Sequence, residues 1–354
     1  MKEEIVIKKA LGIDVSKAKF DVCLLTLNMS QQTKIIGTRT FENSVQGIKD
    51  CHSWLANKKI TSTDLHVLME ATGSYYEKLA YKLFHQQYIV YVVLPNKAKR
   101  YMESLGLKSK NDKIDAQGLA KMCAQQQHES WEPMNKSYYD LRGITRQIAS
   151  LQGYKVGLNN QIHALSQGMY EQHELIDQLT QLVAEIVGQI KKLENRIKEV
   201  VAADCYLSEQ VSRITAIKGL SILSVATIIA ETNGFKLFKN QRQLVSYAGY
   251  DVVENSSGKH VGKTKISKKG NSHMRRILHM PSLTTVRCKE PHFIDLFDRV
   301  YARTGIKKKG YVAVQKKLLV LIYTLWKKES EYVKKEQKQA KQVCLHKMNL
   351  SEVA

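Results

Sequence analysis

Residues 10–125 alternate between strand-like and helix-like segments in an order that few folds share. Three segments with strand patterns come first, followed by helix, strand, helix, strand and helix. The strand-like segments are 10–15, 19–27, 34–41, 65–69 and 88–94, and the helices begin near 43, 75 and 112. The first three strands suit an antiparallel meander, and the continuously apolar last one is typical of a buried strand. This order predicts an α/β domain.

The predicted order of elements is that of an RNase H-like (RuvC-like) domain, in which metal-binding acids occupy predictable places. Asp14 ends the first strand and Glu70 follows the fourth, while Asp112 and Asp115 open the last helix on one of its faces. Two Mg²⁺ ions that promote phosphodiester cleavage need several carboxylates at one point. The sequence therefore predicts a catalytic Mg²⁺ site formed by these four acids.

Each acid taken alone also has a structural interpretation. Asp14 suits a turn, and Asp112 suits the first turn of a helix, where the helix dipole favours negative charge. It is their joint placement that favours the metal site. Asp21, Asp50 and Asp64 do not fall at the expected places, and they are not part of the predicted site.

Apolar residues of the middle third recur at helical spacing. They step mainly by threes and fours from Leu141 to Met169 and again from Leu175 to Ile197. Two long helices with heptad seams fit this pattern, and they form either a coiled-coil stalk for dimerisation or the core of a helical bundle. The predicted domains are the RNase H-like domain (1–130), coiled-coil helices (131–205), a mainly α, basic domain (206–330) and a charged tail (331–354).

The net charge of the 354-residue chain is +22, an excess that favours a polyanionic partner. Nucleic acid and an anionic membrane surface both qualify, and a basic protein without either partner is the alternative. No apolar run approaches the ~18 residues of a membrane span, and residues 1–9 do not resemble a signal peptide. We therefore expect no membrane partner and a cytoplasmic, nucleoid-associated location.

A second candidate site lies in the basic segment 254–276, ENSSGKHVGKTKISKKGNSHMRR. A serine hydroxyl beside glycine can approach a phosphate closely, and neighbouring cations would stabilise a pentavalent phosphate. Taken alone, the segment better suits a loop that binds phosphates without sequence preference. The candidate nucleophile is Ser257, with Ser256 as a one-residue alternative, and the candidate nucleic-acid-binding residues are Lys259, Lys263, Lys265, Lys268, Lys269, Arg275 and Arg276.

Taken together, the segments GIDVSK, MEATGSYY, LKSKNDKIDAQ and the 244–278 block resemble the DEDD-type transposases of the insertion-sequence one-ten family. The four acids match that family's metal ligands one by one, and Ser257 matches its nucleophilic serine. The resemblance implies a bridge-RNA-guided recombinase that cuts and rejoins DNA through a serine–DNA bond. It also implies target and donor double-stranded DNA and a structured noncoding guide RNA as partners, and a dimer or tetramer assembled through the coiled coil.

Two other functions remain open from the residues. A RuvC-like, Mg²⁺-dependent, structure-specific endonuclease would need the acids and not Ser257. A non-catalytic nucleic-acid scaffold would need neither, and it would show no dependence on divalent metal. The complete set of acids argues against the scaffold, and the serine segment favours the recombinase.

Overall fold

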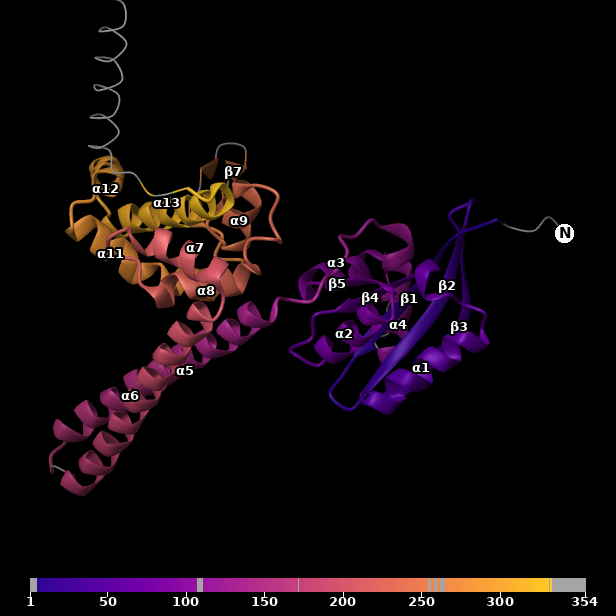
Figure 1. Ribbon diagram of the computed structural model, residues 1–354, viewed down its shortest axis with the longest axis horizontal. Helices are drawn as coiled ribbons and strands as arrows, with labels where there is room; N and C mark the ends of the chain where they lie inside the picture. The colour runs from indigo at the N-terminus through magenta and orange to yellow at the C-terminus, as the bar shows by residue number, and fades with distance from the viewer. Residues whose placement is uncertain are drawn as a thin grey trace, which may run out of the picture. The chain divides into compact units, whose positions relative to one another are not determined.

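The computed structural model describes residues 5–106, 111–170, 172–253, 256–257, 260–261, 265–330 and 332. The chain forms two compact units, Met1–Pro133 and Met134–Ala354 (Figure 1). No helix within the described ranges is long and apolar enough to cross a membrane.

The first unit is built on a five-stranded sheet. Its strands are β1 (Val6–Val15), β2 (Lys19–Asn28), β3 (Thr33–Glu42), β4 (Leu65–Glu70) and β5 (Ile89–Val93), in the order β3-β2-β1-β4-β5. The first three strands form the predicted antiparallel meander, whereas β4 pairs in parallel with both β1 and β5. This mixed sheet confirms the predicted RNase H-like topology.

Helices cover both faces of the sheet because alternate residues of each strand point to opposite sides. Leu11, Ile13 and Val15 of β1 join a core with α1 (Val45–Asn57) and α2 (Glu77–His85). Ala10 joins a second core with α3 (Pro95–Ser104) and α4 (Asp112–Gln125). The even-numbered residues of β1 therefore face α4.

Helix α4 lies directly on strand β1 at Gly12. A Cβ atom on Gly12 would clash with the backbone nitrogen of Ala120 and the backbone oxygen of Ala116. Only glycine allows the backbones of helix and strand to approach so closely. This contact sets the distance between the start of α4 and the end of β1, where the predicted acids lie.

We expect Gly12→Ala to destabilise the first unit by about 3 kcal/mol, since the added methyl group meets backbone rather than a mobile side chain. Gly153→Ala is the matched control, because this glycine lies in a helix with open space around its Cβ position. The control should stabilise the chain slightly, by about 0.5–1 kcal/mol. Differential scanning calorimetry of both variants measures the effect, and equal thermal transitions would show that α4 does not depend on this contact.

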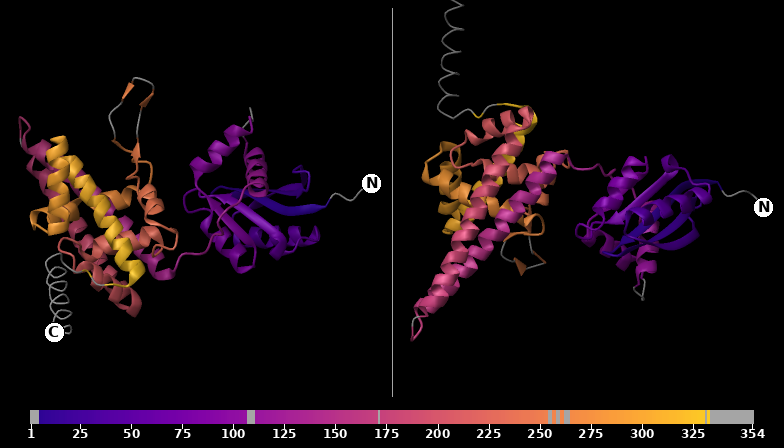
Figure 2. Two further views of the ribbon diagram at one scale, coloured as in Figure 1. Left: turned by 90° about the horizontal axis from the view of Figure 1, so that it is seen from above. Right: turned by 60° about the horizontal axis from the view of Figure 1, so that its bottom comes forward.

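The second unit begins with two long helices, α5 (Lys136–Ser166) and α6 (His173–Ala202), which fold back on each other (Figure 2). Both helices and the join between them were predicted. The remaining helices are α7 (Cys205–Thr215), α8 (Ile222–Thr232), α9 (Gln241–Tyr247), α10 (Ser272–Ile277), α11 (His279–Arg287), α12 (Pro291–Thr304) and α13 (Lys307–Lys328).

One hydrophobic core joins the base of the α5–α6 hairpin to the helices that follow it. Leu141 and Ile148 of α5 and Ile197 of α6 are buried in this core, together with Leu318 and Ile322 of α13. The core therefore holds the hairpin at one end only, and the rest of the hairpin extends away from it (Figure 2).

Candidate functional site

The first two predicted acids lie side by side at one edge of the sheet. Asp14 is the penultimate residue of β1, and Glu70 is the last residue of β4. The two strands are parallel and Ile13 pairs with Met69, so Asp14 and Glu70 are the next residues along their strands. Both are even-numbered residues on the face that α4 covers. Asp14 and Glu70 are partly buried there.

The other two acids approach from the start of α4. Asp112 and Asp115 lie in its first turn, and the side chain of Asn111 caps the helix by accepting a hydrogen bond from the Ile114 amide at 2.9 Å. The helix dipole favours carboxylates at this end. Because α4 packs on Gly12, its first turn reaches the end of β1.

The electrostatics of Asp14 show that the four acids gather. Burial is the main cause that raises the pKa of Asp14 to about 6, and the charges of Asp115, Asp112 and Glu70 raise it further. Among the described residues, however, no three His, Cys, Asp or Glu side chains are close enough to hold one metal ion. The structure therefore brings the predicted acids into one loose cluster.

Two further residues belong to this cluster and were missed from the sequence. Asp21 of β2 is paired with Asp14 across the β1–β2 hairpin, and its charge also raises the pKa of Asp14. The ammonium group of Lys19 donates a hydrogen bond of 2.8 Å to Asp112 Oδ2. This bond lowers the pKa of Asp112 and raises that of Lys19. The tight turn between two predicted strands was the available signal, since it places Asp14 and Asp21 on paired positions.

The donor chemistry of the cluster fits a hard divalent cation. All four predicted ligands are carboxylates, and oxygen ligands suit Mg²⁺ or Mn²⁺ rather than softer metals. Burial is the main cause of the raised pKa of Asp14, and repulsion from the neighbouring carboxylates adds to it. The residues present therefore fit the predicted Mg²⁺ site.

We expect divalent-metal affinity to depend on pH through Asp14. Its carboxyl must lose a proton to bind metal, and its pKa is raised to about 6. Affinity should thus be nearly constant above pH 7 and fall about tenfold for each pH unit below 6. Mn²⁺ titrations of the full chain between pH 5 and 8 measure this, and a flat profile down to pH 5 would contradict it.

The predicted serine lies in a strand pair that stands out from the helices of the second unit (Figure 2). Strands β6 (Val252–Val253) and β9 (Lys265–Ile266) form its base, and β7 (Ser256–Ser257) pairs with β8 (His260–Val261) beyond them. Ser257 is paired with His260. The segment thus contains two short antiparallel strand pairs.

The base of this hairpin is tied firmly to α9 and α10. Hydrogen bonds join the Ser267 amide to the Asp251 carbonyl and the Asn271 amide to the Tyr247 carbonyl, both at 2.7 Å. Gly270 has a φ of 154°, and a Cβ atom there would clash with the Tyr247 carbonyl. Arg275 Nη1 donates to the carbonyls of Ala248, Gly270 and Asn271. These contacts fix the direction in which the hairpin leaves the helices.

The predicted nucleic-acid-binding cations fall into three groups. Lys265, Lys268, Lys269 and Arg276 are exposed around the hairpin base. Arg275 is partly buried and supports the backbone there, so its predicted contact with nucleic acid stays a prediction. Lys259 and Lys263 lie outside the described residues.

An ion pair between a buried carboxylate and a half-exposed arginine connects the hairpin base to α5. Glu231 of α8, whose side chain is 1% exposed, accepts two hydrogen bonds from Arg146 and one from Asn271. Burial alone would raise the pKa of Glu231, but these bonds hold it below its usual value. Asn271 also caps α10, so one carboxylate links the long hairpin, α8 and the serine hairpin. Arg146 and Glu231 also border a pocket of about 400 Å³, where Arg276 adds positive charge.

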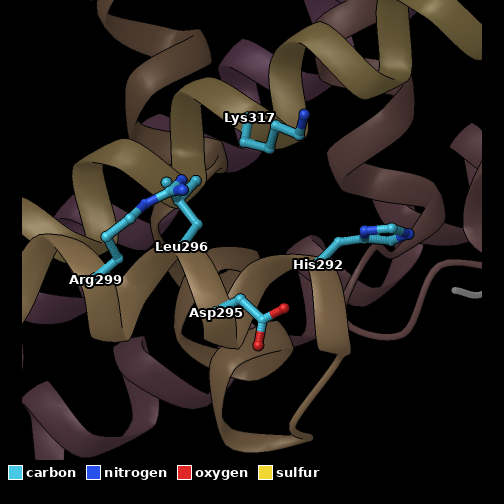
Figure 3. A pocket seen from close by; sticks show the side chains of 5 residues that line it. All are labelled: His292, Asp295, Leu296, Arg299 and Lys317. Atoms are coloured by element: carbon cyan, nitrogen blue, oxygen red, sulfur yellow. The ribbon is translucent and has the colours of Figure 1, made fainter.

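A smaller hollow of about 260 Å³ lies between α12 and α13 (Figure 3). His292, Asp295 and Arg299 of α12 line it together with Lys317 of α13. The Asp295 carboxylate lies near the cationic side chains of Arg299 and Lys317, so the charges that line the hollow partly cancel. It contains no set of acids comparable to the cluster in the first unit.

Comparison with known proteins shows the family of the chain. A DEDD transposase model matches residues 11–171, and the model for the Transposase IS116/IS110/IS902 family matches residues 211–298. The chain belongs to this transposase family. The first match contains the four acids, and the second contains the serine hairpin.

The relatives of this transposase include DNA-rearranging proteins. It is 26% identical over 329 residues to the pilin gene-inverting protein of Moraxella lacunata, covering 93% of this chain and 98% of that protein. It is 24% identical over 299 residues to the transposase for insertion sequence element IS1111A of Coxiella burnetii, covering 76% of each. The transposase is thus an enzyme of DNA recombination.

Solved structures similar to part of the transposase include two Holliday-junction proteins. T. thermophilus RuvC in complex with Holliday junction substrate is 17% identical, with a TM-score of 0.23, and the match covers 32% of this chain and 90% of that one. The fowlpox virus Holliday junction resolvase is 12% identical, with a TM-score of 0.24, and the match covers 31% and 93%.

Proposed function

We propose that the transposase cuts and rejoins DNA through a covalent bond between Ser257 and a DNA phosphate. A divalent-metal site at Asp14, Glu70, Asp112 and Asp115 would serve the same reaction, and a structured noncoding RNA would select target and donor DNA. The gathering of four carboxylates around Asp14 is the observation that carries the proposal. Without a cation to bind, such a cluster costs the fold free energy through charge repulsion.

The covalent step conserves the phosphodiester bond. The Ser257 hydroxyl oxygen attacks the phosphorus, the bond from phosphorus to a deoxyribose oxygen breaks, and that oxygen leaves as a hydroxyl. Rejoining is the reverse reaction with a hydroxyl from another strand, so no external energy source is needed. Bound Mg²⁺ would supply neutralisation of charge on the reacting oxygens. The exposed cations at the hairpin base would hold flanking phosphates in place.

The α5–α6 hairpin is the proposed oligomerisation element, as a coiled coil. Between 151 and 196, no described residue is fully buried. Leu175 and Leu182 of α6 lie seven residues apart, and each is 44% exposed. A heptad seam left open in this way would be covered by a second hairpin of the same kind. We propose a dimer or tetramer that assembles through these helices.

The guide RNA is proposed from the family resemblance and the charge. With a net charge of +22, the transposase can bind DNA and a second polyanion together. Sequence choice by base pairing would leave the protein to recognise backbone and shape, as in other guided systems.

The test is to incubate the full chain with the noncoding RNA that flanks its element, Mg²⁺ and labelled DNA carrying the element junction. We expect a protein–DNA adduct that survives denaturation and is lost when either RNA or Mg²⁺ is omitted. Metal-dependent cleavage without any adduct would instead support the RuvC-like endonuclease. An adduct that forms equally well without RNA would contradict the guided mechanism alone.

A further inference from the structure

A lysine ammonium group lies inside the acid cluster. Lys19 Nζ is 2.8 Å from Asp112 Oδ2 and 3.4 Å from Asp21 Oδ2. Lys19 and Asp21 are two residues apart on β2, so both point to the face that α4 covers. The lysine therefore bridges the sheet and the first turn of α4.

The two carboxylates that Lys19 contacts differ in their surroundings. Asp21 is 5% exposed, and it accepts a hydrogen bond from the Thr40 hydroxyl of β3. Asp112 is exposed, with 53% of its side chain accessible. Asp21 is thus the fixed partner of Lys19, and Asp112 is the partner that can be exchanged.

We propose that Lys19 is an internal counter-ion that competes with the divalent metal for Asp112 and releases it when a DNA phosphate arrives. This rests on the proposed metal site. A metal ion at the four acids needs the Asp112 carboxylate, which Lys19 already contacts. The ammonium group and the metal ion also repel each other, because both are positively charged. The Lys19 side chain is 48% exposed, so a backbone phosphate can reach its ammonium group and replace Asp112. Metal loading would then be coupled to DNA binding.

The test measures Mn²⁺ affinity of the full chain without nucleic acid for the wild type, Lys19→Met and Lys17→Met. Lys17 is the matched control, an exposed lysine on the same β1–β2 turn, and its loss removes the same charge. We expect Lys19→Met to bind Mn²⁺ about tenfold more tightly, and Lys17→Met to change affinity by at most about twofold. Equal affinities of the two variants, or weaker binding by Lys19→Met, would overturn the proposal.

A second measurement tests the coupling to DNA. Duplex DNA is added, and the Mn²⁺ bound by the same DNA alone is subtracted. DNA should tighten Mn²⁺ binding severalfold in the wild type and little in Lys19→Met, and an equal gain in both would overturn the coupling.

The Asp14→Asn variant distinguishes the proposed metal site from the proposed counter-ion role of Lys19. If Asp14→Asn leaves Mn²⁺ binding unchanged, the proposed metal site is rejected. If Asp14→Asn loses Mn²⁺ binding but Lys19→Met binds Mn²⁺ no more tightly than the wild type, only the counter-ion role of Lys19 is rejected.

Discussion

Asp14→Asn is expected to lower the rate of DNA strand cleavage by at least about a thousandfold while the transposase stays folded. Asp14 is the acid on which the charges of Asp115, Asp112 and Glu70 converge, so its amide variant removes the centre of the proposed metal site. Single-turnover cleavage of labelled junction DNA with saturating Mg²⁺ measures the loss. A variant that keeps wild-type cleavage would place the reaction elsewhere.

The same variant should make the metal-free protein more stable, which separates lost chemistry from lost folding. The folded-state pKa of Asp14 is raised from 3.8 to about 6, so its contribution favours folding below pH 4 and is lost as pH rises through 6. Above that pH the ionised carboxylate costs stability, and Asn removes the cost. After allowance for solvent screening, we expect a gain of about 1 kcal/mol at pH 8 and none at pH 4.

Thermal unfolding at both pH values measures this effect. Asp50→Asn on α1 is the control, an exposed carboxylate in the same unit. It should change stability little at either pH. A loss of stability in Asp14→Asn at pH 8 would mean that the carboxylate is held by favourable contacts rather than by repulsion from its neighbours.

The acid cluster could be predicted because it follows from strand direction. Parallel strands end at one edge of a sheet, so Asp14 and Glu70 had to meet once the order of elements was known. Asp21 lies within a strand, and its pairing with Asp14 depends on the strand register, which the order of elements does not give. The contact between Lys19 and Asp112 could not be predicted, because the partner of a flexible side chain depends on the folded structure.

Local sequence patterns were not enough to predict where a helix begins when one residue suits two structural positions. Pro95 directly follows the strand predicted over 88–94, and it is also the first residue of α3, a position that suits its fixed φ. The first helix is predicted to begin near 43, and Ser44 is its cap, where the serine hydroxyl accepts a hydrogen bond from the Gly47 amide. The Asn43 amide group instead donates to the carbonyls of Ser16 and Tyr75, a role that tertiary contacts decide.

Ser257→Ala is expected to abolish the covalent protein–DNA adduct completely, because alanine has no oxygen to form the phosphate ester. Strand joining should fall with it by at least about a thousandfold. The measurement is denaturing electrophoresis of labelled junction DNA after incubation with protein, RNA and Mg²⁺. Metal-dependent cleavage that continues in Ser257→Ala would indicate the endonuclease mechanism.

Ser256→Ala is the matched control for this experiment, since it makes the same chemical change one position away on β7. Ser257 is the proposed nucleophile, so the phosphate ester does not need the Ser256 hydroxyl. We expect Ser256→Ala to keep the adduct. The reverse result, with the adduct lost in Ser256→Ala and kept in Ser257→Ala, would assign the nucleophile to Ser256 and leave the serine mechanism intact. Loss in neither variant would reject a serine nucleophile in this hairpin, whose firmly tied base would then serve DNA binding alone.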